Sequence, residues 1–89
     1  MKAIITVTGK DCMGIIAKVS FECVNNNVNI IDISQSVLKD YFAMIMLVDI
    51  DKISIPFNDF IDRMSILGAN NGLIIHTMHE DIFNSMHRI

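Results

Sequence analysis

The chain has 89 residues, enough for one domain, and 52% of them are hydrophobic while only 19% are charged. A domain of this size buries only about 60% of the surface of its unfolded chain. The surplus of apolar residues therefore predicts a second packed face or a partner subunit. The formal net charge is −3 and the seven Lys and Arg residues are scattered, which argues against direct nucleic-acid binding.

Membrane and export classes are also excluded by the sequence pattern. The longest apolar stretches are interrupted well short of the roughly 18 residues that a membrane span needs. The N-terminus enters a strand pattern directly, without the apolar core of a signal peptide. We therefore expect a cytoplasmic protein in which Cys12 and Cys23 are reduced thiols.

The first elements in chain order are a strand and a helix. Apolar and polar residues alternate over residues 2–8, which predicts a half-buried strand. Residues 13–26 show helical spacing, and the predicted buried face consists of Ile15, Ile16, Val19 and Cys23. Residues 25–27 are three consecutive asparagines, which tolerate the left-handed conformation that ends a helix.

A hairpin of two strands is predicted next, over residues 28–38 and 41–50, with a tight turn at residues 39–40. The apolar neighbours Ile30 and Ile31 point to opposite faces unless a bulge lies between them. The second strand is apolar on both faces, with Phe42, Met44, Met46 and Val48 on one and Ala43, Ile45 and Leu47 on the other. Such a strand is covered on both sides, or it is central and partly covered by a partner.

The last elements are a helix, a strand and a short terminal helix. Pro56 suits the first turn of a helix over residues 57–67, whose apolar stripe is Phe57, Phe60, Ile61, Met64 and Leu67. Gly68 and residues 69–72 are expected to stop this helix, and residues 73–79 are expected to form a strand. Residues 80–89 can form a short helix that must dock through Ile82, Phe83, Met86 and Ile89.

This β-α-β-β-α-β order with right-handed crossovers predicts a ferredoxin-like α+β sandwich. Its four-stranded antiparallel sheet carries both main helices on one face and leaves the other face bare. We assign residues 1–79 to the domain and residues 80–89 to a C-terminal helical extension.

The turn over residues 9–14 is the most informative local feature. Gly9 and Gly14 allow a tight turn, and Asp11 is a residue type that caps helices. The N–H groups of residues 12–15 at the helix start can bind a carboxylate, and the alternative is that water satisfies them. Asn29 offers a donor and an acceptor together, and the alternative is a simple turn residue.

In these motifs the chain resembles an ACT domain, a small-molecule regulatory module. The resemblance is carried by Asp11-Cys12-Met13-Gly14 and by Asn29-Ile30. Two further runs resemble free-standing ACT proteins of the UPF0237 type and the related glycine cleavage system transcriptional repressors, namely Asp32-Ile33-Ser34-Gln35 and Tyr41-Phe42-Ala43-Met44. The resemblance implies a non-catalytic module that binds an amino acid, forms a homodimer or higher oligomer, and acts through a separate protein.

A ligand is then expected at the turn, against the start of the second strand of the same or the neighbouring subunit. The candidate ligand-binding residues are Gly9, Asp11, Cys12, Met13, Gly14, Ile15, Asn29, Ile30 and Asp32. Asp11 and Asp32 are the expected acceptors for a ligand ammonium group. The alternative interpretation is an interaction module that forms homo-oligomers and binds no ligand.

Metal, cofactor and catalytic interpretations have less support. His76 and His79 leave opposite faces if their strand continues, and they and His87 are interpreted as solvated. Cys12 is interpreted as an ordinary thiol, although a helix start can lower the pKa of a thiol. We expect no metal, no cofactor and no enzymatic activity, because no nucleophile has a recognisable base.

Overall fold

The computed structural model describes residues 1–10 and 13–86. Its elements are β1 (Lys2–Gly9), α1 (Ile15–Asn25), β2 (Asn29–Leu38), β3 (Tyr41–Asp49), α2 (Phe57–Asn70), β4 (Ile74–His79) and α3 (Glu80–Met86). Most boundaries lie within two residues of those predicted, a difference typical of helix and strand ends.

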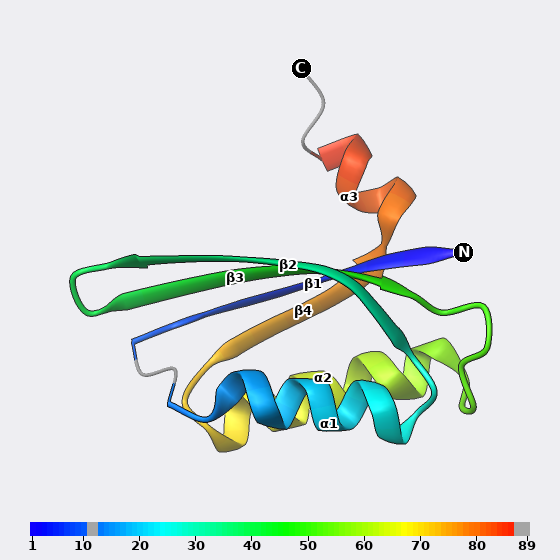
Figure 1. Cartoon of the computed structure of the whole chain (residues 1–89), viewed down its shortest axis with the longest axis horizontal. Helices are drawn as coiled ribbons and strands as arrows, with labels where there is room; N and C mark the ends of the chain where they lie inside the picture. Colours follow the sequence, from blue (N-terminus) through cyan, green and yellow to red (C-terminus); the bar gives the residue numbers. More distant parts are fainter. Residues whose placement is uncertain (11–12, 87–89) are drawn as a thin grey trace.

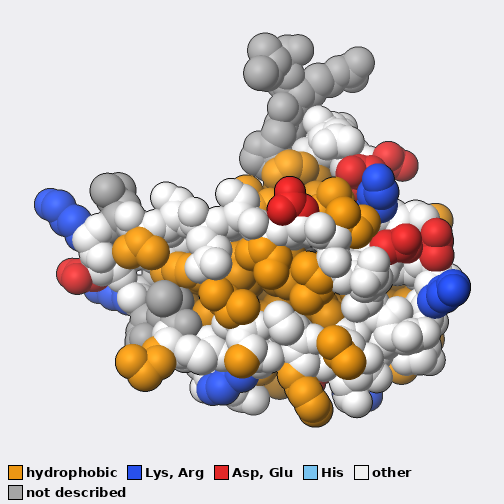
Figure 2. Space-filling view, viewed as in Figure 1, with side chains coloured by type: hydrophobic (Ala, Val, Ile, Leu, Met, Phe, Trp, Pro, Cys, Tyr) orange, Lys and Arg blue, Asp and Glu red, His pale blue; other side chains and the backbone are white. Residues whose placement is uncertain are grey.

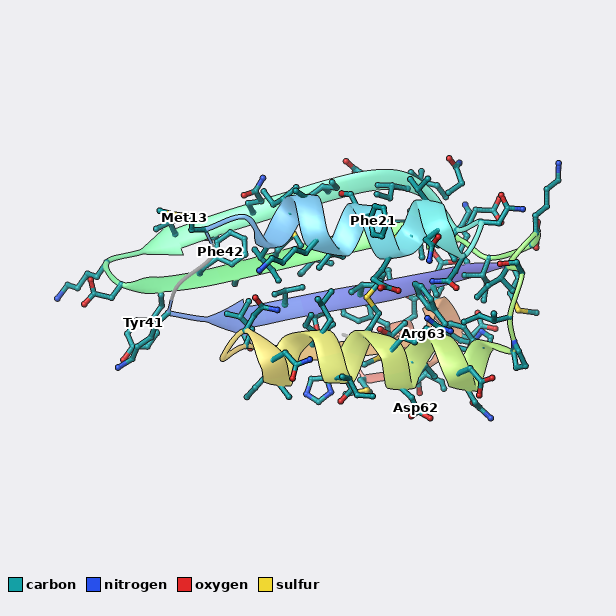
Figure 3. The ribbon with its side chains drawn as sticks, turned by 90° about the horizontal axis from the view of Figure 1, so that it is seen from below. Met13, Phe21, Tyr41, Phe42, Asp62 and Arg63 are labelled. Carbon is teal, nitrogen blue, oxygen red and sulfur yellow. The ribbon has the colours of Figure 1, made fainter. Side chains whose placement is uncertain are left out.

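The four strands form one antiparallel sheet in the order β2-β3-β1-β4. Helices α1 and α2 cover one face of this sheet, and α3 lies on the other side (Figure 1). Viewed from the helical side, α1 lies over β2 and β3 while α2 lies over β1 and β4 (Figure 3). The predicted ferredoxin-like α+β fold is confirmed. Strands β2 and β4 are the two edges of the sheet.

The core lies between the sheet and the two main helices. Each helix buries residues four apart: Ile15, Val19 and Cys23 on α1, and Phe60, Met64 and Gly68 on α2. Facing them are the buried residues of the central strands, Ala3, Ile5, Val7, Phe42, Met44, Met46 and Val48. Spacing of four in a helix and two in a strand directs each set to one face.

Gly68 does not stop α2, contrary to the sequence prediction. It lies inside the helix, which continues to Asn70. A Cβ atom at Gly68 would lie 2.9 Å from both the Leu73 carbonyl oxygen and Ile75 Cγ1, so the glycine lets α2 approach β4 closely. The Leu73 N–H also donates to the Gly68 carbonyl at 2.8 Å, which closes the helix end.

Of the two arrangements that the sequence left open for Ile30 and Ile31, the structure has the bulge. The pairing of β2 with β3 shifts register between Ile30 and Asp32. The extra residue, Ile31, is 45% exposed, whereas Ile30 packs against the core. The bulge shifts the alternation by one residue, so that Ile30 and Ile33 both pack against the core.

The sheet face opposite α1 and α2 is largely open. Ala43 and Ile45 of β3 are exposed there, on the face that the predicted sandwich leaves bare. Helix α3 covers part of this face by contacting β1 and β4. The predicted docking stripe of α3 is wrong in part, because Ile82 and Met86 are exposed and Phe83 is only half-buried. Helix α3 has only seven residues, or about two helical turns, which is too short to place all of its apolar side chains against the sheet.

Candidate functional site

The turn between β1 and α1 presents backbone N–H groups at the start of a helix. Gly14 holds the N-cap position in a left-handed conformation, with φ of 73°. The N–H of Lys18 donates to the Gly14 carbonyl at 3.1 Å, so the N–H groups of residues 14–17 precede the helical ladder. These donors lie two residues later than predicted, because the left-handed Gly14 delays the helix to Ile15.

Side chains contribute little to the described part of this turn. Met13 and Gly14 are exposed, and Ile15 is 1% exposed, so its side chain belongs to the core. Gly14, and not the predicted Asp11, holds the N-cap position, and no side chain caps the helix. Asp11 and Cys12 themselves lie outside the described residues. The carboxylate-binding potential of this end therefore comes from the backbone and the helix dipole.

Lys10 and Tyr41 lie beside the turn, and the sequence analysis did not select them. The Lys10 ammonium lies 5.8 Å from the centre of the Tyr41 ring. A shallow depression of about 340 Å³ adjoins them and is lined by Thr8, Gly9, Ser36, Tyr41, Phe42 and Ala43. Figure 3 shows Met13, Tyr41 and Phe42 gathered at this end of the sheet. The strand pairing of Gly9 with Phe42 brings the turn to the hairpin, a contact that sequence spacing does not reveal.

The other predicted residues lie toward the opposite end of the sheet. Asn29 begins β2 and pairs with Asp49 of β3, which in turn pairs with Lys2 of β1, whereas Gly9 of β1 pairs with Phe42 of β3. Lys2 and Gly9 are seven residues apart on β1, a distance of roughly 23 Å at 3.3 Å per residue. Within one chain, the turn and the start of β2 therefore do not meet.

A depression of about 460 Å³ occupies this second end, and we call it the junction depression. It is lined by Val24, Asn27, Val28, Asn29, Asp49, Asp51 and Lys52. Asn27 adopts a left-handed conformation with φ of 61°, and its side-chain amide donates to the Lys52 carbonyl at 2.9 Å. The Ser54 N–H also donates to the Asn26 carbonyl at 2.9 Å. These bonds join the α1–β2 loop to the segment after β3.

Two carboxylates of the junction depression differ in their partners. Asp51 forms an ion pair with the chain's amino terminus. The hydrogen bond from that ammonium group lowers the pKa of Asp51, and the same bond to Asp51 raises the pKa of the amino terminus. Asp49 Oδ1 accepts the backbone N–H of Asp51 at 2.8 Å, and Asp49 makes no ion pair within residues 1–10 and 13–86.

Asp32 and Ile30 do not join either depression. Asp32 is exposed on the open face, where it pairs with Leu47 and its Oδ1 accepts the N–H of Ile33 at 2.9 Å. Ile30 is half-buried against the core. Asn29, in contrast, lines the junction depression.

The remaining reactive side chains that the structure describes do not gather into a site. His76 is exposed and pairs with Thr6 of β1. His79 pairs with Ala3, and the centre of its ring lies 4.5 Å from the centre of the Phe57 ring. The two histidines therefore leave opposite faces, as predicted. Burial raises the pKa of the Cys23 thiol to about 12, so it stays neutral at ordinary pH. The described residues contain no group of three or more metal ligands, and His87 lies outside them.

The sequence and the fold of this chain match an established family. A family model described as an ACT domain matches residues 2–68. The chain belongs to the ACT domain family. ACT domains are regulatory modules that generally bind small ligands, and no catalytic domain is evident in the part of this chain that the structure describes. No described helix of this ACT domain is long and apolar enough to cross a membrane.

Relatives place this ACT domain in the UPF0237 family. A UPF0237 protein of Clostridium perfringens is 48% identical over 89 residues, which is all of both chains. The structure of an ACT domain protein from Streptococcus pneumoniae is 40% identical, with a TM-score of 0.81 over 93% of each chain. A putative glycine cleavage system transcriptional repressor is 26% identical, with a TM-score of 0.67 over 85% of this chain and 43% of its own. The predicted resemblance is confirmed, and the division at residue 79 stays a prediction.

Proposed function

We propose that this ACT domain is a regulatory homodimer that binds a free amino acid and signals its presence to a separate protein. The observation that carries the proposal is the open turn at Gly14, which presents the N–H groups of residues 14–17 ahead of the helical ladder. Such donors, together with the positive pole of α1, favour a carboxylate. Lys10 adds a positive charge beside the same turn.

Pairing of two β2 edges would complete the site. Strand β2 is ten residues long and lies at the edge of the sheet. Antiparallel pairing of β2 with its copy about a two-fold axis brings the Asn29 end of one subunit to the Leu38 end of the other. The Leu38 end is also the end at which the β1–α1 turn lies. Each turn would then face the partner's Asn29, which supplies both a donor and an acceptor.

The apolar surface on this side supports the dimer. Phe21 and Val24 of α1 and Ile31 and Val37 of β2 are between 45% and 74% exposed, and we call them the α1–β2 flank. Figure 2 shows apolar side chains gathered over β2 and α1 on this side of the molecule. Burial of such residues against a second copy would account for the surplus of hydrophobic residues in the sequence.

Ligand binding is tested by a thermal-shift screen against the standard L-amino acids, followed by calorimetry on variants. A ligand at a hundred times its dissociation constant adds about 2.7 kcal/mol of stability, which raises the melting temperature measurably. Asn29→Ala should weaken binding by roughly 1–3 kcal/mol, because it leaves ligand polar groups unpaired. Wild-type affinity in this variant would place the ligand elsewhere.

Gly14→Val tests the turn and needs a matched control. Valine at a φ of 73° is strained, although no atom lies within 4 Å of the added Cβ. Gly72→Val imposes the same strain, because Gly72 has φ of 69° and the same free space around its Cβ. Loss of binding in Gly14→Val, with retention in Gly72→Val, supports the turn as the carboxylate site. Equal binding in both would contradict it.

The second candidate function is a homo-oligomeric interaction module that binds no ligand. The α1–β2 flank favours it, because an apolar surface can hold a partner without any small molecule. A folded dimer that responds to no amino acid in the screen would select this function.

A further inference from the structure

The sheet face opposite α1 and α2 carries few charged side chains. Strand pairing and the alternation of buried and exposed positions identify its outward residues, which we call the open face: Ile4, Thr6 and Thr8 of β1, Asp32, Ser34 and Ser36 of β2, Ala43, Ile45 and Leu47 of β3, and Ile74, His76 and Met78 of β4. Among them Asp32 is the only Asp, Glu, Lys or Arg residue. Depletion of charge is typical of the centre of a protein interface.

The open face is covered at one end and bare at the other. On β1, Ile4 is 7% exposed, Thr6 is half-buried and Thr8 is exposed. On the antiparallel strand β4, Met78 is half-buried, whereas Ile74 is 60% exposed. Helix α3 accounts for this gradient, because it contacts β1 and β4 and rises from the sheet near the start of β1, at the end opposite the β2–β3 hairpin (Figure 1). The half of the open face nearer the hairpin is therefore left bare.

Helix α3 has an apolar side that stays exposed in the described chain. Ile82 is 51% exposed and Met86 is 65% exposed, and their spacing of four places them on one side of the helix. A helix of seven residues is not stable without packing, so further contacts on that side would stabilise it. The charges at the base of α3 have both signs within the chain, because Glu80 and Asp81 line a depression together with Lys2 and the amino terminus.

We propose that the open face binds the open face of a second copy of this chain, so that each α3 covers the bare half of its partner's sheet. The two-fold axis lies across the strands at Thr6, which pairs with Ile45 and His76. Rotation about this axis places the end of one sheet that carries α3 over the bare end of the other, at Thr8 and Ile74. Such a contact is isologous and closes with two copies. It needs no ligand, and so it goes beyond the proposed function.

The surface available matches that of a weak but specific contact. Four strands about 4.8 Å apart and eight residues long make a face of roughly 500 Å², of which about half is bare. The exposed side of the seven-residue helix α3 adds about 250 Å². Each copy would then bury on the order of 500 Å², or about 1,000 Å² in total, which is in the size range of weak interfaces. A second copy supplies both the helix and the bare half that it covers.

This contact is compatible with pairing of two β2 edges. Ser34 pairs with Ile45, so the axis that crosses β1 at Thr6 crosses β2 near the middle of its length, Asn29–Leu38. If β2 pairs along its whole length, the axis of the edge-paired dimer passes through the same point, normal to the sheet. Perpendicular two-fold axes that meet generate a closed tetramer. Because the face contact is small, we expect edge-paired dimers at low concentration and tetramers at high concentration.

Sedimentation of the full chain over a concentration series tests the contact. The mass of the wild type should double between about 1 μM and about 500 μM, the range in which a weak interface forms. Ile82→Glu/Met86→Glu places charges on α3, and Ile45→Glu/Ile74→Glu places them on the bare half. Each double variant should abolish this doubling by raising the dissociation constant at least about a hundredfold. All four side chains are exposed in one chain, so both variants should keep the wild-type melting temperature.

Two control variants separate this contact from other associations. Ile66→Glu adds a charge at an exposed position of α2 and should double in mass as the wild type does. Phe21→Glu/Val37→Glu alters the α1–β2 flank, and should lower the mass at low concentration but leave the doubling intact. A wild type that does not double, or doubling that persists in either open-face variant, overturns this contact. The proposed function would still stand in that case, because amino-acid binding at the turn is measured separately.

Discussion

Helices α1 and α2 perform the same structural task but differ on their outer surfaces. Each crosses the same face of the sheet and buries three residues at spacing four. Outward, α2 carries Asp62 and Arg63, and Figure 3 shows both projecting from it. Outward, α1 carries Phe21 and Val24, which are 66% and 74% exposed. The inner faces specify the fold, whereas the outer faces differ in polarity: α1 exposes two large apolar side chains and α2 exposes one, Ile66.

The N-terminal ends of the two helices differ in the same direction. Helix α2 starts after Pro56 with Asp59 in its first turn, and these residues suit the start of an isolated surface helix. Helix α1 starts at a left-handed glycine, with no acidic residue in its first turn. The C-terminal ends of the two helices are alike, since neither has a basic residue in its last turn and each is followed by an asparagine whose side-chain amide donates to a helix carbonyl. We interpret the N-terminal end of α1 as the end available for ligand binding, and α2 as the helix that serves stability.

The largest effect is expected from breaking the inner face of α2. Met64→Asp places an unpaired charge at a position that is fully buried, at a cost that exceeds the few kcal/mol of stability typical of a small domain. We expect the variant to lose its cooperative thermal transition, measured by circular dichroism. Ile66→Asp is the control on the same helix, because Ile66 is 60% exposed and should tolerate the charge. Cooperative unfolding of Met64→Asp at the wild-type temperature would contradict this assignment of the inner face.

The inner faces are also what the sequence could predict. Spacing of four on α1 and α2 and alternation on β1 and β3 identify the core, because burial repeats with the period of each element. The two adjacent isoleucines, Ile30 and Ile31, conflict with alternation, so the sequence marked this point as irregular, but only the strand pairing shows that a bulge lies there. The end of α2 was not predictable, because Gly68 reads as a helix stop unless the close approach of β4 is known.

The candidate site was less predictable than the core. The turn was identified from its glycines, but its distance from Asn29 depends on how the strands are ordered in the sheet. Lys10 and Tyr41 meet only because Gly9 pairs with Phe42. Residues distant in sequence come together here through strand pairing, which periodicity does not report.

A second prediction tests the outer surfaces. The double variant Phe21→Glu/Val37→Glu places one charge on each element of the α1–β2 flank. If two flanks pair, burial of these charges should raise the dimer dissociation constant at least about a hundredfold, or about 2.7 kcal/mol. Sedimentation should then show a monomer where the wild type is a dimer. Ile66→Glu adds a charge to the exposed surface of α2 and should leave the dimer intact. A wild-type monomer, or an unaffected double variant, would remove the flank as the interface.

The smallest effect is expected from a substitution in the core at Thr77, on β4, the strand that α2 contacts. Thr77 pairs with Ile5 of β1 and is 7% exposed, and its hydroxyl has no hydrogen-bond partner among the described residues. Valine has nearly the same shape and needs no partner, so Thr77→Val should stabilise the protein by about 1 kcal/mol.

For a domain of this size, about 1 kcal/mol corresponds to a rise of roughly 4–8 °C in melting temperature, measurable by calorimetry. Thr8→Val is the matched control, because Thr8 is exposed and its hydroxyl can bond to water, so its melting temperature should change little. A lower melting temperature in Thr77→Val would show that the hydroxyl is bonded in the folded protein. The core on the α2 side of the sheet would then contain a hydrogen-bonded polar group, the Thr77 hydroxyl.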